Sequence, residues 1–191
     1  MKASGEFAIV IDGDLYVGLL QTSHAEALFR LQEHNRPRLE AWMPFMDSLR
    51  SVEDVSRFIR AGLERFGSER GLSAGIWWQG ELAGWIGMRV HEDGYGTLGY
   101  WIGGEYEGKG LATKAVLSLV AYAFDVLKLA RIEIRCEPAN TRSIAVAERA
   151  GFRREGLLRD AICVRGVLLD LVLFARVARV GRDVMSDASS A

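Results

Sequence analysis

The stretch EGKGLATKAVLSLVAYAF, residues 107–124, places Gly108 and Gly110 directly before a long apolar segment. Because glycine has no Cβ, a loop built around these two residues can point several backbone N–H groups into one small volume. No proline or further glycine follows within the stretch, so the sequence predicts a buried helix over residues 110–127. The free N–H groups and the positive dipole end of such a helix favour an anion, and Lys109 adds a positive charge beside them. The stretch therefore predicts a phosphate-binding loop.

Two nucleotide-binding motifs resemble this loop but do not fit it fully. A Walker loop is nearly matched by Gly103, Gly108 and Lys109, yet Gly110 stands where a hydroxyl residue must coordinate magnesium. A dinucleotide fingerprint places a small residue at the position of Thr113, but it opens a βαβ unit, whereas a strand meander precedes this loop. A plain helix start, without a ligand, is the third alternative.

The segment YWIGGEYEGKGLATKA, residues 100–115, resembles the acetyl-CoA loop of the GNAT N-acetyltransferases. The pattern of that family, Gln/Arg-x-x-Gly-x-Gly/Ala, falls on residues 107–112. Glu107 departs from it, since it replaces Gln or Arg. A carboxylate aimed at a pyrophosphate would repel it, so we expect Glu107 to turn to solvent or to favour the helix amino end. The resemblance implies acetyl-CoA as the cofactor.

Length and composition favour one compact domain. The chain has 191 residues, 49% of them hydrophobic, and we expect a single domain over residues 1–180 with a disordered small, polar tail at 181–191. The net charge of −1 argues against a nucleic-acid partner. Arginine outnumbers acids in residues 131–191, which fits either an acidic cofactor or a merely solvated surface.

The cysteines and the amino end indicate a reducing, cytoplasmic location. Cys136 and Cys163 are isolated in apolar runs, so we expect two buried apolar side chains and neither a disulfide framework nor a metal site. The first residues hold no apolar run long enough for a signal peptide or a membrane span.

Along the chain the pattern predicts a first strand at 15–20, a helix after Thr22 or Ser23, and a bent connector over 35–47. A helix begins at Ser51, three strands form a meander over 72–103, and the central helix follows. A strand at 131–137, a helix ending at Gly151 and a hairpin around Arg165 complete the domain.

This order is similar to the GNAT fold, an α/β (α+β) architecture. The resemblance, which covers roughly residues 15–177, implies a mixed, mostly antiparallel seven-stranded sheet flanked by helices. Its fourth and fifth strands splay apart, and the pantetheine arm lies between them. The phosphate loop, the NTRS–AGF segment and the LRDA–LLD hairpin together resemble the RimJ/RimL-like branch, the ribosomal-protein N-acetyltransferases. Homo-oligomerisation is left open, because no coiled coil is evident.

The resemblance also implies the cofactor-binding residues. Backbone groups near Tyr100 pair with pantetheine, and the complete set is Trp101, Ile102, Gly108, Lys109, Gly110, Leu111, Ala112, Thr113, Asn140 and Ser143. Asn140 offers a donor and an acceptor to a pantetheine amide, and Ser143 is a candidate catalytic residue that gives a proton to the departing sulfur. The alternative is that Asn140 only caps a helix and Ser143 is an ordinary first-turn residue.

The acceptor side is less clearly marked. Asn35, Arg36 and Trp42 resemble a segment that walls the acceptor site in this branch, although Trp42 also fits a purely core role. Trp101, the tryptophan nearest the expected thioester, is a further acceptor candidate. Asp170 matches an acid in the last hairpin of the branch and is a candidate base or acceptor anchor, or else a surface acid; His91 is a weaker candidate.

The resulting hypothesis is an acetyl-CoA-dependent N-acetyltransferase that transfers directly to a primary amine, either a protein or peptide amino terminus or a small molecule. An α-amine titrates near ~8 and a lysine near ~10.4, so an amino-terminal acceptor needs no strong base. Two alternatives remain: a P-loop-like nucleotide site, and a protein of the same fold that binds acyl-CoA only as a sensor or scaffold.

Overall fold

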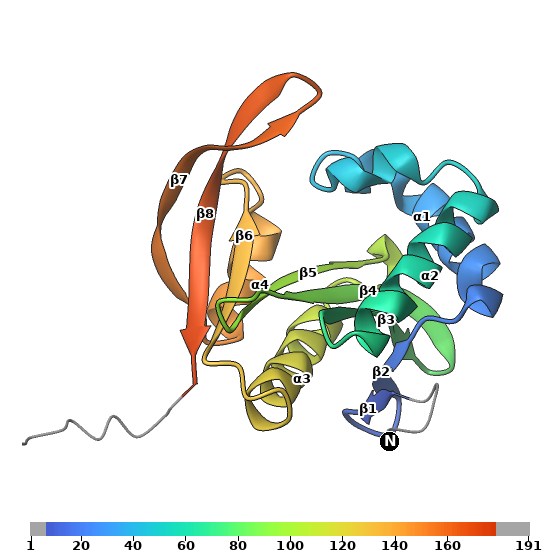
Figure 1. Ribbon diagram of the computed structural model, residues 1–191. Helices are drawn as coiled ribbons and strands as arrows, with labels where there is room; N and C mark the ends of the chain where they lie inside the picture. Colours follow the sequence, from blue (N-terminus) through green and yellow to red (C-terminus); the bar gives the residue numbers. More distant parts are fainter. Residues whose placement is uncertain (1–6, 179–191) are drawn as a thin grey trace, which may run out of the picture.

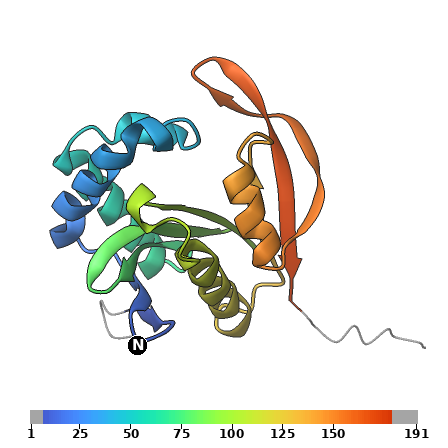
Figure 2. The same cartoon turned by 180° about the vertical axis from the view of Figure 1, so that it is seen from behind.

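The computed structural model describes residues 7–178, so the tail predicted to be disordered lies outside the described residues. An open eight-stranded sheet has the order β1-β2-β3-β4-β5-β6-β8-β7. Helices α1 and α2 pack on one face and α3 and α4 on the other, as the two views in Figure 1 and Figure 2 show. Every neighbouring pair of strands is antiparallel except β5 and β6. The mixed, mostly antiparallel sheet is confirmed.

The elements have the following bounds. The strands are β1 Ala8–Val10, β2 Leu15–Leu19, β3 Gly71–Trp78, β4 Glu81–Val90, β5 Tyr95–Ile102, β6 Arg131–Cys136, β7 Arg153–Val164 and β8 Val167–Val177. The α-helices are α1 Ala25–Leu39, α2 Val52–Gly67, α3 Leu111–Asp125 and α4 Thr141–Arg149. Three short 3-10 turns are η1 Thr22–His24, η2 Pro44–Ser48 and η3 Gly104–Tyr106.

Three expectations from the sequence are corrected. The sheet has eight strands rather than seven, because the short β1 pairs with residues 16–18 of β2. The connector expected from residue 35 begins later, since α1 continues through Pro37 in its last turn. Cys136 is buried as expected, but Cys163 is exposed, because the hairpin of β7 and β8 extends beyond the helices that cover the sheet.

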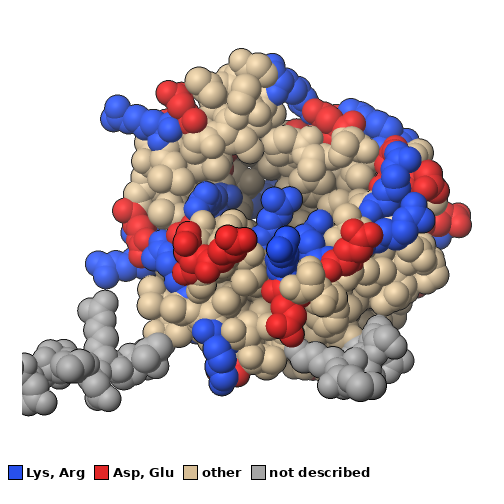
Figure 3. Space-filling view, in the orientation of Figure 1, with Lys and Arg blue, Asp and Glu red and all other residues tan. Residues whose placement is uncertain are grey.

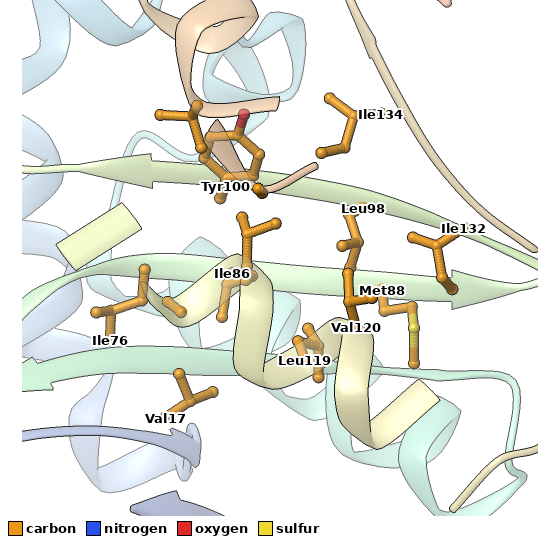
Figure 4. Packing of buried hydrophobic residues seen from close by; sticks show 14 of the residues in the cluster. Val17, Ile76, Ile86, Met88, Leu98, Tyr100, Leu119, Val120, Ile132 and Ile134 are labelled. Atoms are coloured by element: carbon orange, nitrogen blue, oxygen red, sulfur yellow. The ribbon is translucent and has the colours of Figure 1, made fainter. Parts of the chain in front are cut away.

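The main core lies between the sheet and α3. Leu111, Ala115, Leu119 and Ala123 face the sheet from one side of α3, and all are buried. Figure 4 shows Leu119 and Val120 packed against apolar side chains of the central strands. Fully burying a leucine side chain stabilises a fold by about 1.5–3 kcal/mol. This packing fixes the start of α3, and with it the glycine loop, against the end of β5.

The two parallel strands separate where the glycine loop begins. β5 pairs with β6 only from Tyr95 to Leu98, which lie opposite Arg131 to Ile134. In the part of the chain that the structure describes, no strand pairs with residues 99–102 on this side of β5. The predicted splay is confirmed, and the added β1 places it between the fifth and sixth strands.

Candidate functional site

A cavity of about 610 Å³ opens at the splay between β5 and β6. Its walls come from the carboxyl end of α1, the end of β5, the glycine loop and the first turns of α4. Figure 3 shows this face hollowed, with basic side chains gathered beside the opening. Within the described range, 7–178, the charged side chains that line the cavity are Arg38, Arg142 and Arg149 and one carboxylate, Glu107. The lining is therefore net basic and suits an anionic ligand.

The glycine loop forms the anion-binding part of this cavity. Gly108 and Gly110 have φ of 75° and 74°, the left-handed region that favours glycine. Gly110 is the N-cap of α3 and has no side chain that could cap the first-turn N–H groups, and it lines the cavity. A Cβ at either glycine would meet nothing within 4 Å, which leaves open space above the loop. Leu111, Ala112 and Thr113 also line the cavity.

Lys109 does not join this lining. Its ammonium donates to the carbonyl oxygen of Glu105 at 2.9 Å and lies 5.3 Å from the ring centre of Trp78. The positive charge at the cavity comes instead from Arg38, Arg142 and Arg149, which no motif in the sequence marks as site residues.

The start of α4 brings Asn140 and Ser143 to the opposite wall. The Asn140 side chain accepts the Ser143 N–H at 3.1 Å, so it caps the helix, and both residues line the cavity. The Ser143 hydroxyl lies 3.1 Å from the hydroxyl of Tyr100. Burial raises the pKa of Tyr100 to about 12, so its phenol is protonated at neutral pH. Tyr100 thus orients Ser143 at the splay.

Glu107 is half-buried, with 34% of its side chain exposed, and lies between two arginines rather than turning freely to solvent. It accepts hydrogen bonds from Arg38 of α1 and from Arg142 of α4, the latter at 2.8 and 3.0 Å. Two guanidinium groups compensate its charge, which explains how a carboxylate is tolerated beside an anion-binding loop. Arg38 also donates to the carbonyl oxygen of Ile102 at 2.6 Å.

Of the acceptor candidates, the structure brings Trp42 and Trp101 to the cavity. Trp101 is 5% exposed, and its indole N–H has no hydrogen-bond partner. Asn35 is buried beneath the lining and accepts the N–H of Gly104 at 2.8 Å. Arg36 donates to the carbonyl oxygens of residues 46 and 49 and thereby ties down the connector between α1 and α2. Neither Asn35 nor Arg36 lines the cavity.

Asp170 and His91 lie away from the cavity. Asp170 accepts the backbone N–H of Asp160 at 3.0 Å, where β7 has an irregular register with β8. Asp160 has a φ of 48°, so the carboxylate supports a strained turn of the hairpin strand. His91 stacks on Tyr95 at 4.3 Å between ring centres. The structure thus does not bring either side chain to Ser143.

Residues 7–178 contain neither a candidate metal-binding cluster nor a candidate membrane-spanning helix. No group of three His, Cys, Asp or Glu side chains in this range is placed to hold a metal ion. No helix within it combines the length and apolar character needed to cross a membrane.

Comparison with known proteins identifies the family. Residues 15–153 match the model of the acetyltransferase (GNAT) domain. YdaF of Bacillus subtilis, provisionally named a ribosomal N-acetyltransferase, is 34% identical over 91% of this chain and 96% of its own. The ribosomal-protein-serine acetyltransferase of Escherichia coli is 25% identical over 88% of this chain and 96% of its own. The microcin C7 self-immunity acetyltransferase MccE, solved with acetyl-CoA and AMP, superimposes with a TM-score of 0.83 at 25% identity, covering 87% of this chain and 94% of its own. The chain therefore belongs to the GNAT family, as an acetyl-CoA-dependent N-acetyltransferase that resembles RimJ and RimL.

Proposed function

We propose that this N-acetyltransferase acts on the amino terminus of a protein or peptide. The observation that carries the proposal is the absence of an available base in the cavity. Among residues 7–178, the lining holds no histidine and no aspartate, and the one carboxylate that these residues contribute to it, Glu107, is paired with two arginines. An α-amine, with a pKa near ~8, loses its proton to water far more readily than a lysine does at ~10.4. The ribosomal-protein acetyltransferases among the relatives support this choice.

The described residues fit the cofactor. Acetyl-CoA supplies an acetyl group activated as a thioester. The first-turn N–H groups of α3 would hold the pyrophosphate, and the edge of β5 at Trp101 and Ile102, beyond its pairing with β6, would hold the pantetheine arm. The arginines of the lining balance the phosphate charge.

Two residues on α4 complete the proposed site. Asn140 fixes the first turn of the helix, and Ser143, oriented by Tyr100, would give its hydroxyl proton to the departing sulfur and regain a proton from water. Trp42 and Trp101 wall the acceptor side. Asn35, Arg36 and Asp170 act indirectly. Asn35 holds Gly104 ahead of the glycine loop, Arg36 holds the α1–α2 connector, and Asp170 holds the hairpin.

The cofactor assignment is tested by thermal unfolding with acetyl-CoA, with ATP–magnesium and NAD as controls. At ~100 times its dissociation constant, a ligand adds roughly 2.7 kcal/mol to the free energy of unfolding. We expect this stabilisation from acetyl-CoA alone. Stabilisation by ATP alone would overturn the assignment of the loop.

The acceptor is tested by thiol release with three peptides of one sequence that contains a lysine. One has a free amino terminus, one a blocked amino terminus, and one a free terminus with the lysine changed to alanine. We expect turnover of the first and third only. Turnover that depends on the lysine and not on a free amino terminus would contradict an amino-terminal acceptor. Turnover of small amines but of none of the three peptides would contradict it as well.

A further inference from the structure

Hydrogen bonds and chain connections link six residues that line the cavity into a closed circuit, the polar belt: Tyr100, Ile102, Arg38, Glu107, Arg142 and Ser143. From β5 the belt passes through the hydroxyl of Tyr100, 3.1 Å from that of Ser143. Arg142 is the chain neighbour of Ser143 on α4, and it donates to both carboxylate oxygens of Glu107. The belt therefore reaches the glycine loop from β5 by way of α4.

The second half of the belt returns through α1. One guanidinium nitrogen of Arg38 donates a hydrogen bond to Glu107, and the other terminal nitrogen donates to the carbonyl oxygen of Ile102, at the end of β5. The same guanidinium donates to Asn35, which in turn accepts the N–H of Gly104. Glu107 is thus the point where the wall from α1 and the wall from α4 meet.

We infer that Glu107 is a positioning residue for acetyl transfer, an inference that rests on the site proposed above. Its carboxylate holds α1 and α4 in register on either side of the glycine loop, and so fixes Ser143 relative to the end of β5. Through the belt, one side chain sets the distance between the acceptor wall and the wall that carries Ser143.

Charge makes this role separable from cofactor binding. A carboxylate beside an anion-binding loop repels phosphate groups, so Glu107 works against cofactor affinity. Its pairs with Arg38 and Arg142 are also partly solvent-exposed, with side-chain exposures of 34% for Glu107, 32% for Arg38 and 72% for Arg142, and such pairs contribute little to stability. Removing the charge should therefore lower turnover, leave cofactor affinity unchanged or increase it, and leave stability nearly unchanged.

The test is Glu107→Gln, which keeps the size of the side chain. We expect kcat to fall roughly 10- to 100-fold, because misplacing a catalytic group by about 1 Å has an effect of this order. The dissociation constant of acetyl-CoA, measured by calorimetry, stays the same or decreases, and the melting temperature shifts by less than about 2 °C. Arg142→Gln should lower kcat as well but weaken acetyl-CoA binding, because it removes a positive charge.

Arg60→Gln is the matched control. It breaks the exposed pair of Arg60 with Glu53 on α2, 2.9 Å apart and away from the cavity, and should change none of these quantities. An unchanged kcat in Glu107→Gln, or acetyl-CoA binding that weakens in parallel with kcat, would overturn the inference.

Amide hydrogen exchange provides a readout that needs no acceptor. In Glu107→Gln we expect faster exchange in residues 103–107 and 141–145 and unchanged exchange in β3 and β4. Unchanged exchange in both belt segments would contradict the positioning role. The two proposals fail differently: a parent protein that acetyl-CoA does not stabilise overturns the cofactor site, whereas a normal parent with an indistinguishable Glu107→Gln overturns only the belt.

Discussion

Tyr100 shows how burial of one residue shapes the site. The residue is 9% exposed, and its hydroxyl lies 3.2 Å from the carbonyl oxygen of Ser143 and 3.1 Å from its Oγ. Burial raises its pKa to about 12, because the phenolate would lose its hydration. Tyr100 is therefore a permanent hydroxyl at working pH and holds Ser143 in place, rather than acting as a base.

This pKa predicts a pH-dependent effect of Tyr100→Phe. At pH 7 the variant should lose about 1 kcal/mol of unfolding free energy with its hydrogen bond. The unfolded phenol titrates at 10.0 and the folded one at about 12, so unfolding releases a proton between these values and the parent loses stability as pH rises. Phenylalanine has no such loss. The difference in unfolding free energy between parent and variant should therefore shrink by about 1 kcal/mol at pH 11. Urea unfolding at both pH values measures it, and a constant gap would contradict the burial argument.

At the scale of elements, the start of α3 depends on one backbone conformation. Gly110 has a φ of 74°, and a side chain in this region costs roughly 1–2 kcal/mol, more for a β-branched residue. Gly110→Val should shift the loop out of this conformation and lower acetyl-CoA affinity at least about tenfold, because the first-turn N–H groups no longer converge. Calorimetric titration measures the loss.

Gly13→Val is the control for this substitution. A Cβ at Gly13 also meets nothing within 4 Å, but its φ lies outside the left-handed region. Acetyl-CoA affinity should stay at the parent value. Equal losses in the two variants would show that the conformation of Gly110 is not what the cofactor requires.

The turn of the β7–β8 hairpin is held to η2 by an ion pair. At its turn, Arg165 pairs with Asp47 of η2 through two hydrogen bonds of 2.7 and 2.9 Å. Arg165→Gln should leave the melting temperature within about 2 °C, because an exposed ion pair contributes little, yet speed hydrogen exchange near the turn. Asp47→Asn should do the same, and the double variant should add nothing further; additive effects would mean that the two residues act independently.

Local signals in the sequence predicted the elements better than the contacts between them. Helix α3 was expected over 110–127 and spans Leu111–Asp125, and the hairpin turns at Arg165 as predicted. The three-residue β1 was missed because it forms only against β2. The glycine spacing marks its loop locally, whereas the pairs of Glu107 with Arg38 and Arg142 join residues 69 and 35 positions apart. No local pattern could reveal the belt.

At the scale of the whole molecule, charge is distributed unevenly. The chain has a net charge of −1, yet three arginines and one glutamate line the cavity. Fields of exposed charges are screened over about 10 Å at 0.1 M salt, so the local lining rather than the total charge governs an anionic ligand there. The overall charge excluded nucleic acid as an expected partner but carried no information about this basic cavity.

Salt should therefore weaken acetyl-CoA binding through its phosphates. Between 50 mM and 500 mM NaCl we expect the dissociation constant of acetyl-CoA to rise several-fold, because the arginine–phosphate attraction is screened. S-acetylpantetheine carries the same thioester arm without phosphates, so its weaker binding should change little. Arg142→Gln should flatten the salt dependence for acetyl-CoA, since one of the contributing charges is gone. The same salt dependence of the dissociation constant for both ligands would mean that salt acts on the fold and not on the basic lining. Unfolding of the free protein over the same salt range separates these two causes.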